Sequence, residues 1–151
     1  MAMAGAHRAV GTIVGALAAM LGVSASALAS PREDYMLQCM GCHGATAEGV
    51  PGKVPPLAHT LIQFMRSPAG RSYVLRVPGA SNSMLSDAQL AEVLNWIASG
   101  FGAGPLPPST PAFTTQEVAT HRHTAMASVQ ATRREVLKQL AASGSAPAED
   151  Y

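Results

Sequence analysis

Apolar residues recur at helical spacing between residues 86 and 99. Those that would share one buried face are Leu90, Val93, Leu94 and Ile97. Ser86 is a favourable N-cap, Gln89 completes a capping box with it, and Gly100 is a typical stop. The pattern predicts an amphipathic helix that packs on a core.

A second amphipathic pattern follows a proline-rich segment at residues 103–113, which we expect to be a stiff linker. Thr114 and Glu117 have capping-box spacing, and one continuous helix is expected from there to Ala142. Its stripe would contain Val118, Arg122, Ala125, Val129, Val136 and Leu140. Residues 114–151 are therefore predicted to be an amphipathic helix with a frayed tail.

Towards the N-terminus, the pattern also favours helix. Ser30 and Pro31 suit a helix start, with Glu33 and Asp34 in the first turn. The glycines that break the following segment into loops are Gly41, Gly44, Gly49 and Gly52. We predict an all-α domain over residues 30–102, with the later helix as a C-terminal extension.

Residues 1–29 have the pattern of an export signal. Arg8 precedes an apolar run over residues 9–23, and "ALA" at 27–29 fits a cleavage site. A run of about 15 residues is short for a membrane span, which needs about 20. We expect a cleaved signal peptide, a periplasmic protein, and no membrane span after processing.

The net charge of the chain does not change the predicted fold or export. The chain has ten Lys and Arg residues against nine Asp and Glu, and loss of Arg8 with the signal makes the two counts equal. No basic stripe or aromatic-interleaved patch is present, so nucleic acid binding is not expected.

The two cysteines lie in "CMGCH" at residues 39–43. A redox disulfide is disfavoured, because the surroundings lack a strand-helix-strand pattern. Zinc would need a fourth ligand besides Cys39, Cys42 and His43. The histidines available for that role are His59, His121 and His123. Cys-x-x-Cys-His is the pattern of c-type haem attachment, with two thioether bonds and a histidine on iron, and it favours one covalent haem c over those alternatives.

Together with "VPPL", a methionine and the helix of residues 86–99, the motif resembles that of small class I cytochromes c of bacteria, between Tyr35 and Phe101. The resemblance implies a fold in which the first and last helices of the haem domain cross. It implies that His43 is the proximal iron ligand. The Pro55 carbonyl would then accept a hydrogen bond from His43 and fix its tautomer.

The resemblance also implies a methionine as sixth iron ligand in the loop before the last helix. Met84 occupies roughly that position, although the loop is shorter than usual in the family. Met65 is the rival, and His59 or an open site are further alternatives. Met84 is our expected distal ligand.

Three further residues have candidate roles near a haem. Arg71 and Arg76 flank an apolar stretch and are either propionate partners or solvated cations. Trp96 lies beside the buried face of its helix, and we interpret it as a packing residue rather than an electron relay. Because every haem feature precedes Gly102, the C-terminal extension is expected to be separable from haem ligation.

These features predict a periplasmic monohaem electron carrier, not an enzyme. Its expected partners are periplasmic redox proteins, with a dehydrogenase donor and an oxidase acceptor as candidates. An open sixth site would instead permit peroxide chemistry or gas binding. A third alternative is the haem subunit of a larger oxidoreductase, docked through its C-terminal helix. The apo-protein is expected to be poorly folded, because the haem would supply much of a small core.

Overall fold

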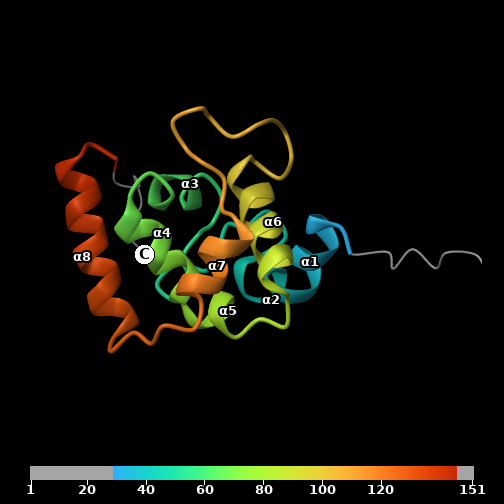
Figure 1. Cartoon of the computed structure of the whole chain (residues 1–151), viewed down its shortest axis with the longest axis horizontal. Helices are drawn as coiled ribbons and strands as arrows, with labels where there is room; N and C mark the ends of the chain where they lie inside the picture. The colour runs from blue at the N-terminus through green and yellow to red at the C-terminus, as the bar shows by residue number, and fades with distance from the viewer. Residues whose placement is uncertain (1–28, 146–151) are drawn as a thin grey trace, which may run out of the picture.

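The computed structural model describes residues 29–145, and the regular elements in that range are helices joined by loops (Figure 1). In chain order the helices are α1 (Pro31–Gln38), α2 (Met40–His43), α3 (Leu61–Phe64), α4 (Pro68–Arg76), α5 (Pro78–Ser81), α6 (Asp87–Ala98), α7 (Thr115–His121) and α8 (Val129–Ala142). The described residues form no strand, and Val50 and Val54 make an isolated β-bridge. The predicted all-α fold is confirmed. The signal-peptide prediction, up to residue 28, and the end of the frayed tail lie outside the described residues.

Helices α1 and α6 begin as their sequences predict. Ser30 and Glu33 form a capping box on α1, and Ser86 and Gln89 form one on α6. The residues predicted for the inner face of α6 are all buried, and the helix packs against α1. Tyr35 on α1 is buried beside them. Helices α1 and α6 therefore frame the core.

The prediction of one continuous C-terminal helix is wrong. Residues 122–128 separate α7 from α8, and α8 begins at the N-cap Ser128. The carbonyls of Thr124 and Ala125 accept hydrogen bonds from Arg76, at 2.9 and 2.6 Å. Because those carbonyls bind a side chain of α4 instead of helical N–H groups, the chain turns there.

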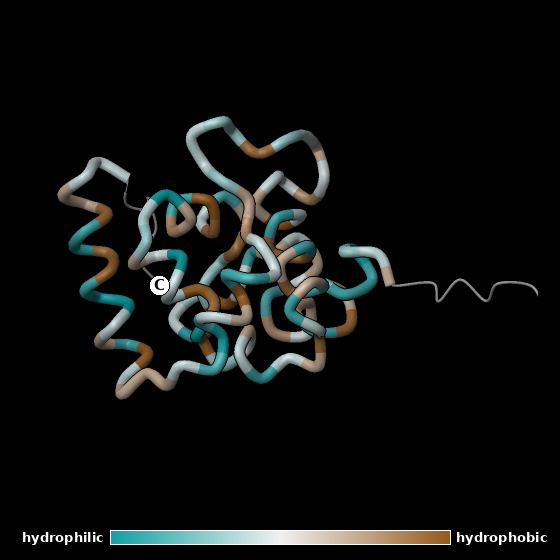
Figure 2. Tube along the Cα trace, viewed as in Figure 1, coloured by the Kyte–Doolittle hydropathy of each residue, from teal (hydrophilic) through white to brown (hydrophobic). Residues whose placement is uncertain are grey.

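Both halves of the extension pack on the preceding helices. Helix α7 lies against α6, and α8 lies against α3 and α4 at the end of the molecule opposite α1 (Figure 1). Hydrophobic and hydrophilic positions alternate along α8 (Figure 2). Its buried positions include Val136 and Leu140, which fix the helix to the body.

The Thr114 capping box forms only in part. The Thr114 side chain accepts from the Glu117 backbone N–H at 3.1 Å. The Glu117 carboxylate instead binds Arg71 of α4, at 2.6 and 2.5 Å. This bidentate pair ties α7 to α4.

Among residues 29–145, no helix has the length and apolar character that a membrane crossing requires.

Candidate haem-binding site

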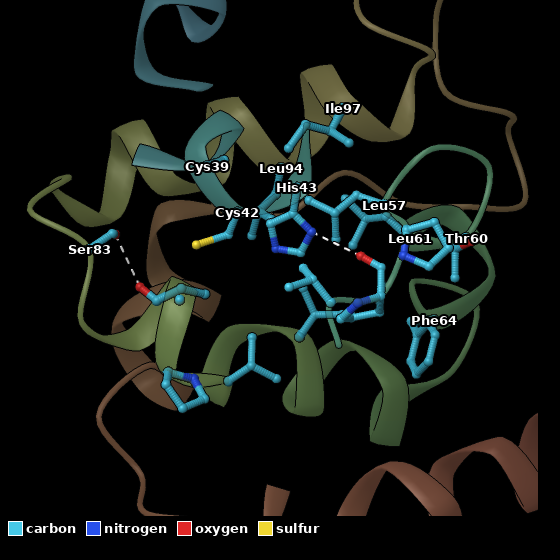
Figure 3. Close-up of a pocket in the computed structure, with 18 of the residues that line it drawn as sticks. Cys39, Cys42, His43, Leu57, Thr60, Leu61, Phe64, Ser83, Leu94 and Ile97 are labelled. Carbon is cyan, nitrogen blue, oxygen red and sulfur yellow. Dashed lines mark hydrogen bonds between the residues drawn. The ribbon is translucent and has the colours of Figure 1, made fainter. Parts of the chain in front are cut away.

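The cysteine-histidine motif lies where α1 passes into α2. Cys39 ends α1, its N–H donating to the Tyr35 carbonyl at 2.9 Å, and its own carbonyl accepts from the His43 N–H at 3.0 Å. The tight turn holds both thiols and the imidazole along one side of a cavity (Figure 3). Both cysteines are free, with Cys39 half-buried and Cys42 exposed.

The cavity beside the motif is large and mostly apolar. Its volume is about 280 Å³, and α3, α4, α5, α6 and α8 contribute to its wall. Leu94 and Ile97 of α6 lie above His43, and Leu61 and Phe64 of α3 lie to one side (Figure 3). An apolar space with two thiols and an imidazole at its wall suits a flat hydrophobic group attached through sulfur.

A backbone carbonyl orients the His43 ring. His43 Nδ1 lies 2.9 Å from the Pro55 carbonyl oxygen, so Nδ1 carries the proton and donates it (Figure 3). Burial lowers the pKa of His43, partly opposed by this hydrogen bond. The neutral ring therefore keeps Nε2 as a free acceptor, the form in which imidazole binds a metal.

The local chemistry disfavours a redox role for these thiols. Burial, with smaller contributions from Asp34 and Cys42, raises the pKa of Cys39 to about 11. A reactive thiol needs a lowered pKa, so Cys39 is a poor nucleophile here. Within residues 29–145, no three His, Cys, Asp or Glu side chains are grouped to hold a metal ion, as the zinc alternative would require.

The sixth-ligand candidates lie outside the cavity wall. Met84 is 87% exposed, whereas Ser83 and Leu85 on either side of it line the cavity. Met65 is 1% exposed and belongs to the hydrophobic core. His59 lines a different cavity, beside Phe101.

Arg122 from the C-terminal extension holds the backbone on both sides of Met84. Its guanidinium donates to the Leu85 carbonyl at 2.7 Å and to the Ser83 carbonyl at 2.6 Å. It also pairs with Asp87 at 3.0 Å. Arg122 is itself buried, so the loop before α6 is fixed from inside the protein.

The arginines singled out in the sequence bind elsewhere. Arg71 pairs with Glu117 and Arg76 binds carbonyls of the segment before α8, and neither lines the cavity. The wall instead contains Val129, which was predicted on the apolar stripe, and Arg133 of α8, which sequence reasoning missed. The available signal was a cation on the apolar stripe of α8, since Arg133 falls in helical register with Val129 and Val136.

One prediction from the sequence has a definite outcome here. Trp96 packs against Tyr35 and Phe101, with ring centroids 5.8 and 4.8 Å apart, so its packing role is confirmed. The expectation that the extension is separable from haem ligation stays a prediction, although α8 supplies Val129 and Arg133 to the cavity wall.

Known proteins have sequences similar to that of this chain. A cytochrome c-552 of Thermus thermophilus is 32% identical over 117 residues, covering 66% of this chain and 78% of that protein. A second cytochrome c-552 of Thermus thermophilus is 31% identical over 99 residues, covering 54% of this chain and 76% of that protein. No protein-family model matches the chain. With its class I cytochrome c-like fold, the chain belongs to the family of small c-type cytochromes, electron carriers with covalently bound haem c.

Proposed function

We propose that this protein is an exported monohaem electron carrier, in which Cys39 and Cys42 hold the haem and His43 is its proximal ligand. The observation that supports this most is the 2.9 Å bond from His43 to Pro55 at the wall of an apolar cavity beside both cysteines. Bound haem supplies one-electron cycling between ferric and ferrous iron. The chain's own contribution is a fixed imidazole, covalent anchoring and a low-dielectric surrounding.

The proposal includes export and processing. Residues 1–29 would be a signal peptide, residues 30–102 the haem domain, 103–113 the linker and 114–151 the C-terminal extension. The periplasm would be the site of haem attachment and function. Partners would be periplasmic redox proteins, with a dehydrogenase as donor and an oxidase as acceptor.

Mass spectrometry of the purified protein tests attachment and processing together. We expect the mass of residues 30–151 plus one haem, and retention of that haem through acid-acetone extraction, because thioether bonds survive denaturation. Cys39→Ala with Cys42→Ala should yield a chain from which acid-acetone removes any haem. Loss of haem from the unaltered protein would overturn the proposal.

Met84 is the distal ligand in this proposal. Met84 faces solvent in the structure, so ligation requires its side chain to turn inward between the fixed residues Ser83 and Leu85. A thioether is a soft, neutral ligand that favours ferrous iron, which suits an electron carrier.

A second candidate function follows from the exposure of Met84. No methionine lines the cavity within the described part of the chain, and an open sixth site would bind small gases or peroxide. Rapid carbon monoxide binding by the reduced protein, with a high-spin ferric spectrum, would favour this candidate. Slow or absent binding with a low-spin spectrum would favour the carrier.

A haem subunit of a larger oxidoreductase is the remaining alternative. The size of the native protein in periplasmic extract distinguishes it from a free carrier. Elution at the size of a single chain supports the carrier, and co-elution with a second polypeptide supports the subunit.

A further inference from the structure

Asp34 is a buried carboxylate on the face of α1 that meets α6. Its side chain belongs to a residue that is 3% exposed, and Gln89 Nε2 of α6 lies 3.4 Å from each carboxylate oxygen. The amide of Gln89 has a fixed orientation, because its Oε1 accepts from the N–H and hydroxyl of Ser86 in the capping box, at 3.1 and 2.9 Å. Gln89 therefore presents its N–H donors to Asp34, as suits an ionised carboxylate, which can only accept.

The Asp34 carboxylate has no cationic partner among residues 29–145. The ion pairs there join other residues, and Asp87 at the start of α6 is paired with Arg122. Of the other charged side chains on these two helices, Arg32 and Glu92 are exposed. Asp34 lies in the first turn of α1, where the helix dipole favours a negative charge. The charge is therefore stabilised by dipoles rather than neutralised, and its field persists in the low dielectric of the interior.

Asp34 lies directly behind the wall of the haem cavity. Gln38, one helical turn further along α1, lines that cavity, as does Leu90, the neighbour of Gln89. Burial, and next the negative charge of Asp34, raise the pKa of Cys39. The field of Asp34 thus reaches a thiol that is proposed to hold the haem.

We propose that Asp34 sets the reduction potential of the bound haem, with its buried charge stabilising ferric over ferrous iron. Ferric iron carries one more positive charge than ferrous iron, so a nearby anion favours it and lowers the potential. This inference rests on the proposed function, in which haem is attached at Cys39 and Cys42. It also bears on partner choice, because a carrier of lower potential needs a stronger reductant as its donor.

The test compares Asp34→Asn with Glu33→Gln by redox titration of the purified holoprotein. Both variants remove one negative charge from the first turn of α1, but Glu33 is exposed, and glutamine can keep its place in the capping box. We expect Asp34→Asn to raise the reduction potential and Glu33→Gln to leave it unchanged, since water screens the exposed charge. The rise should persist between about 0.01 M and 1 M ionic strength, because salt screens buried charges weakly.

Asp34→Glu separates charge from packing. It retains the carboxylate, so it should keep the potential of the unaltered protein even if the longer side chain lowers stability. A raised potential in Asp34→Glu would show that packing sets the potential and would overturn the proposal. Equal potentials for Asp34→Asn and Glu33→Gln would overturn it as well.

Asp34→Ser takes the place of Asp34→Asn if the asparagine variant fails to fold, since serine also removes the charge and retains a small polar side chain. The same comparison with Glu33→Gln then decides. Loss of haem from the unaltered protein on acid-acetone extraction is a separate outcome, which would refute the attachment on which this inference rests.

Discussion

The orientation of His43 depends on a single backbone acceptor. Pro55 has no N–H of its own, but its carbonyl lies 2.9 Å from His43 Nδ1 and selects the tautomer that leaves Nε2 free. Burial lowers the pKa of His43 and so favours the same neutral form. The loop that contains Pro55 therefore orients His43, the residue that is proposed to bind iron.

The two methionine candidates give a residue-scale prediction about the sixth ligand. If Met84 sulfur binds iron, the ferric protein should show a weak near-infrared sulfur-to-iron charge-transfer band. Met84→Ala should abolish that band, open the iron to carbon monoxide and lower the reduction potential, since a soft ligand that favours ferrous iron is lost. Absorption spectra and redox titration of the purified variants are the measurements.

Met65→Ala is the matched control for this prediction. Met65 is buried in the core, so its truncation should cost about 2 to 5 kcal/mol of unfolding free energy while leaving the band intact. Loss of the band in Met65→Ala would reassign the ligand without affecting the carrier proposal.

At the scale of the helices, side chains from both sides join the extension to the rest of the molecule. Arg71 of α4 binds Glu117 of α7, and Asn95 of α6 exchanges hydrogen bonds with the Phe113 backbone at 3.0 and 2.7 Å. Arg122 crosses in the other direction, from the end of α7 to the loop before α6. The helices are thus joined by polar contacts as well as by apolar packing.

Arg122 gives an element-scale prediction. Arg122→Gln should lower the free energy of unfolding by about 3 kcal/mol, because it leaves the buried carbonyl of Leu85 without its charged donor and breaks the pair with Asp87. The loop bearing Met84 should also loosen, which a change in the near-infrared band or in carbon monoxide binding would report. Urea unfolding of the holoprotein measures the stability.

The exposed Arg134 provides the comparison for this substitution. Arg134→Gln should change the unfolding free energy by no more than about 0.5 kcal/mol, as expected for a surface substitution. If both variants unfolded at the same urea concentration, the Arg122 contacts would not hold the loop as described.

The whole molecule is built around an apolar cavity. The core residues of α3, α4 and α6 surround this space, and α8 adds to one side of it. The apolar core of a domain of this size contributes only a small free energy of unfolding. An unfilled cavity lowers it further, because every side chain that lines the cavity loses favourable contacts.

The apo-protein provides a prediction at this scale. A chain in which Cys39 and Cys42 are both replaced by alanine, expressed without its signal in the cytoplasm, should be poorly folded. We expect reduced helical circular dichroism and little protection of α3 and α4 in hydrogen exchange, since these helices pack around the haem space. The holoprotein is the reference. Native-like helicity and protection in the apo chain would show that the polypeptide core suffices.

Local sequence signals predicted much of this protein. The helix start at Ser30, the capping box at Ser86 and the buried face of α6 follow from contacts within a few residues, so they can be predicted without knowledge of the fold. The attachment motif is equally local, because the spacing of Cys39, Cys42 and His43 places all three within two helical turns.

Features that depend on contacts between distant segments could not be predicted from the sequence and became visible only in the folded structure. The break between α7 and α8 arises because Arg76, far away in sequence, takes the carbonyls of Thr124 and Ala125. Arg133 reaches the cavity only because that turn directs α8 back over α3 and α4. Periodicity reports which face of a helix is buried but not what it is buried against, and a cation on that face acquires its role from the neighbours that tertiary packing brings to it.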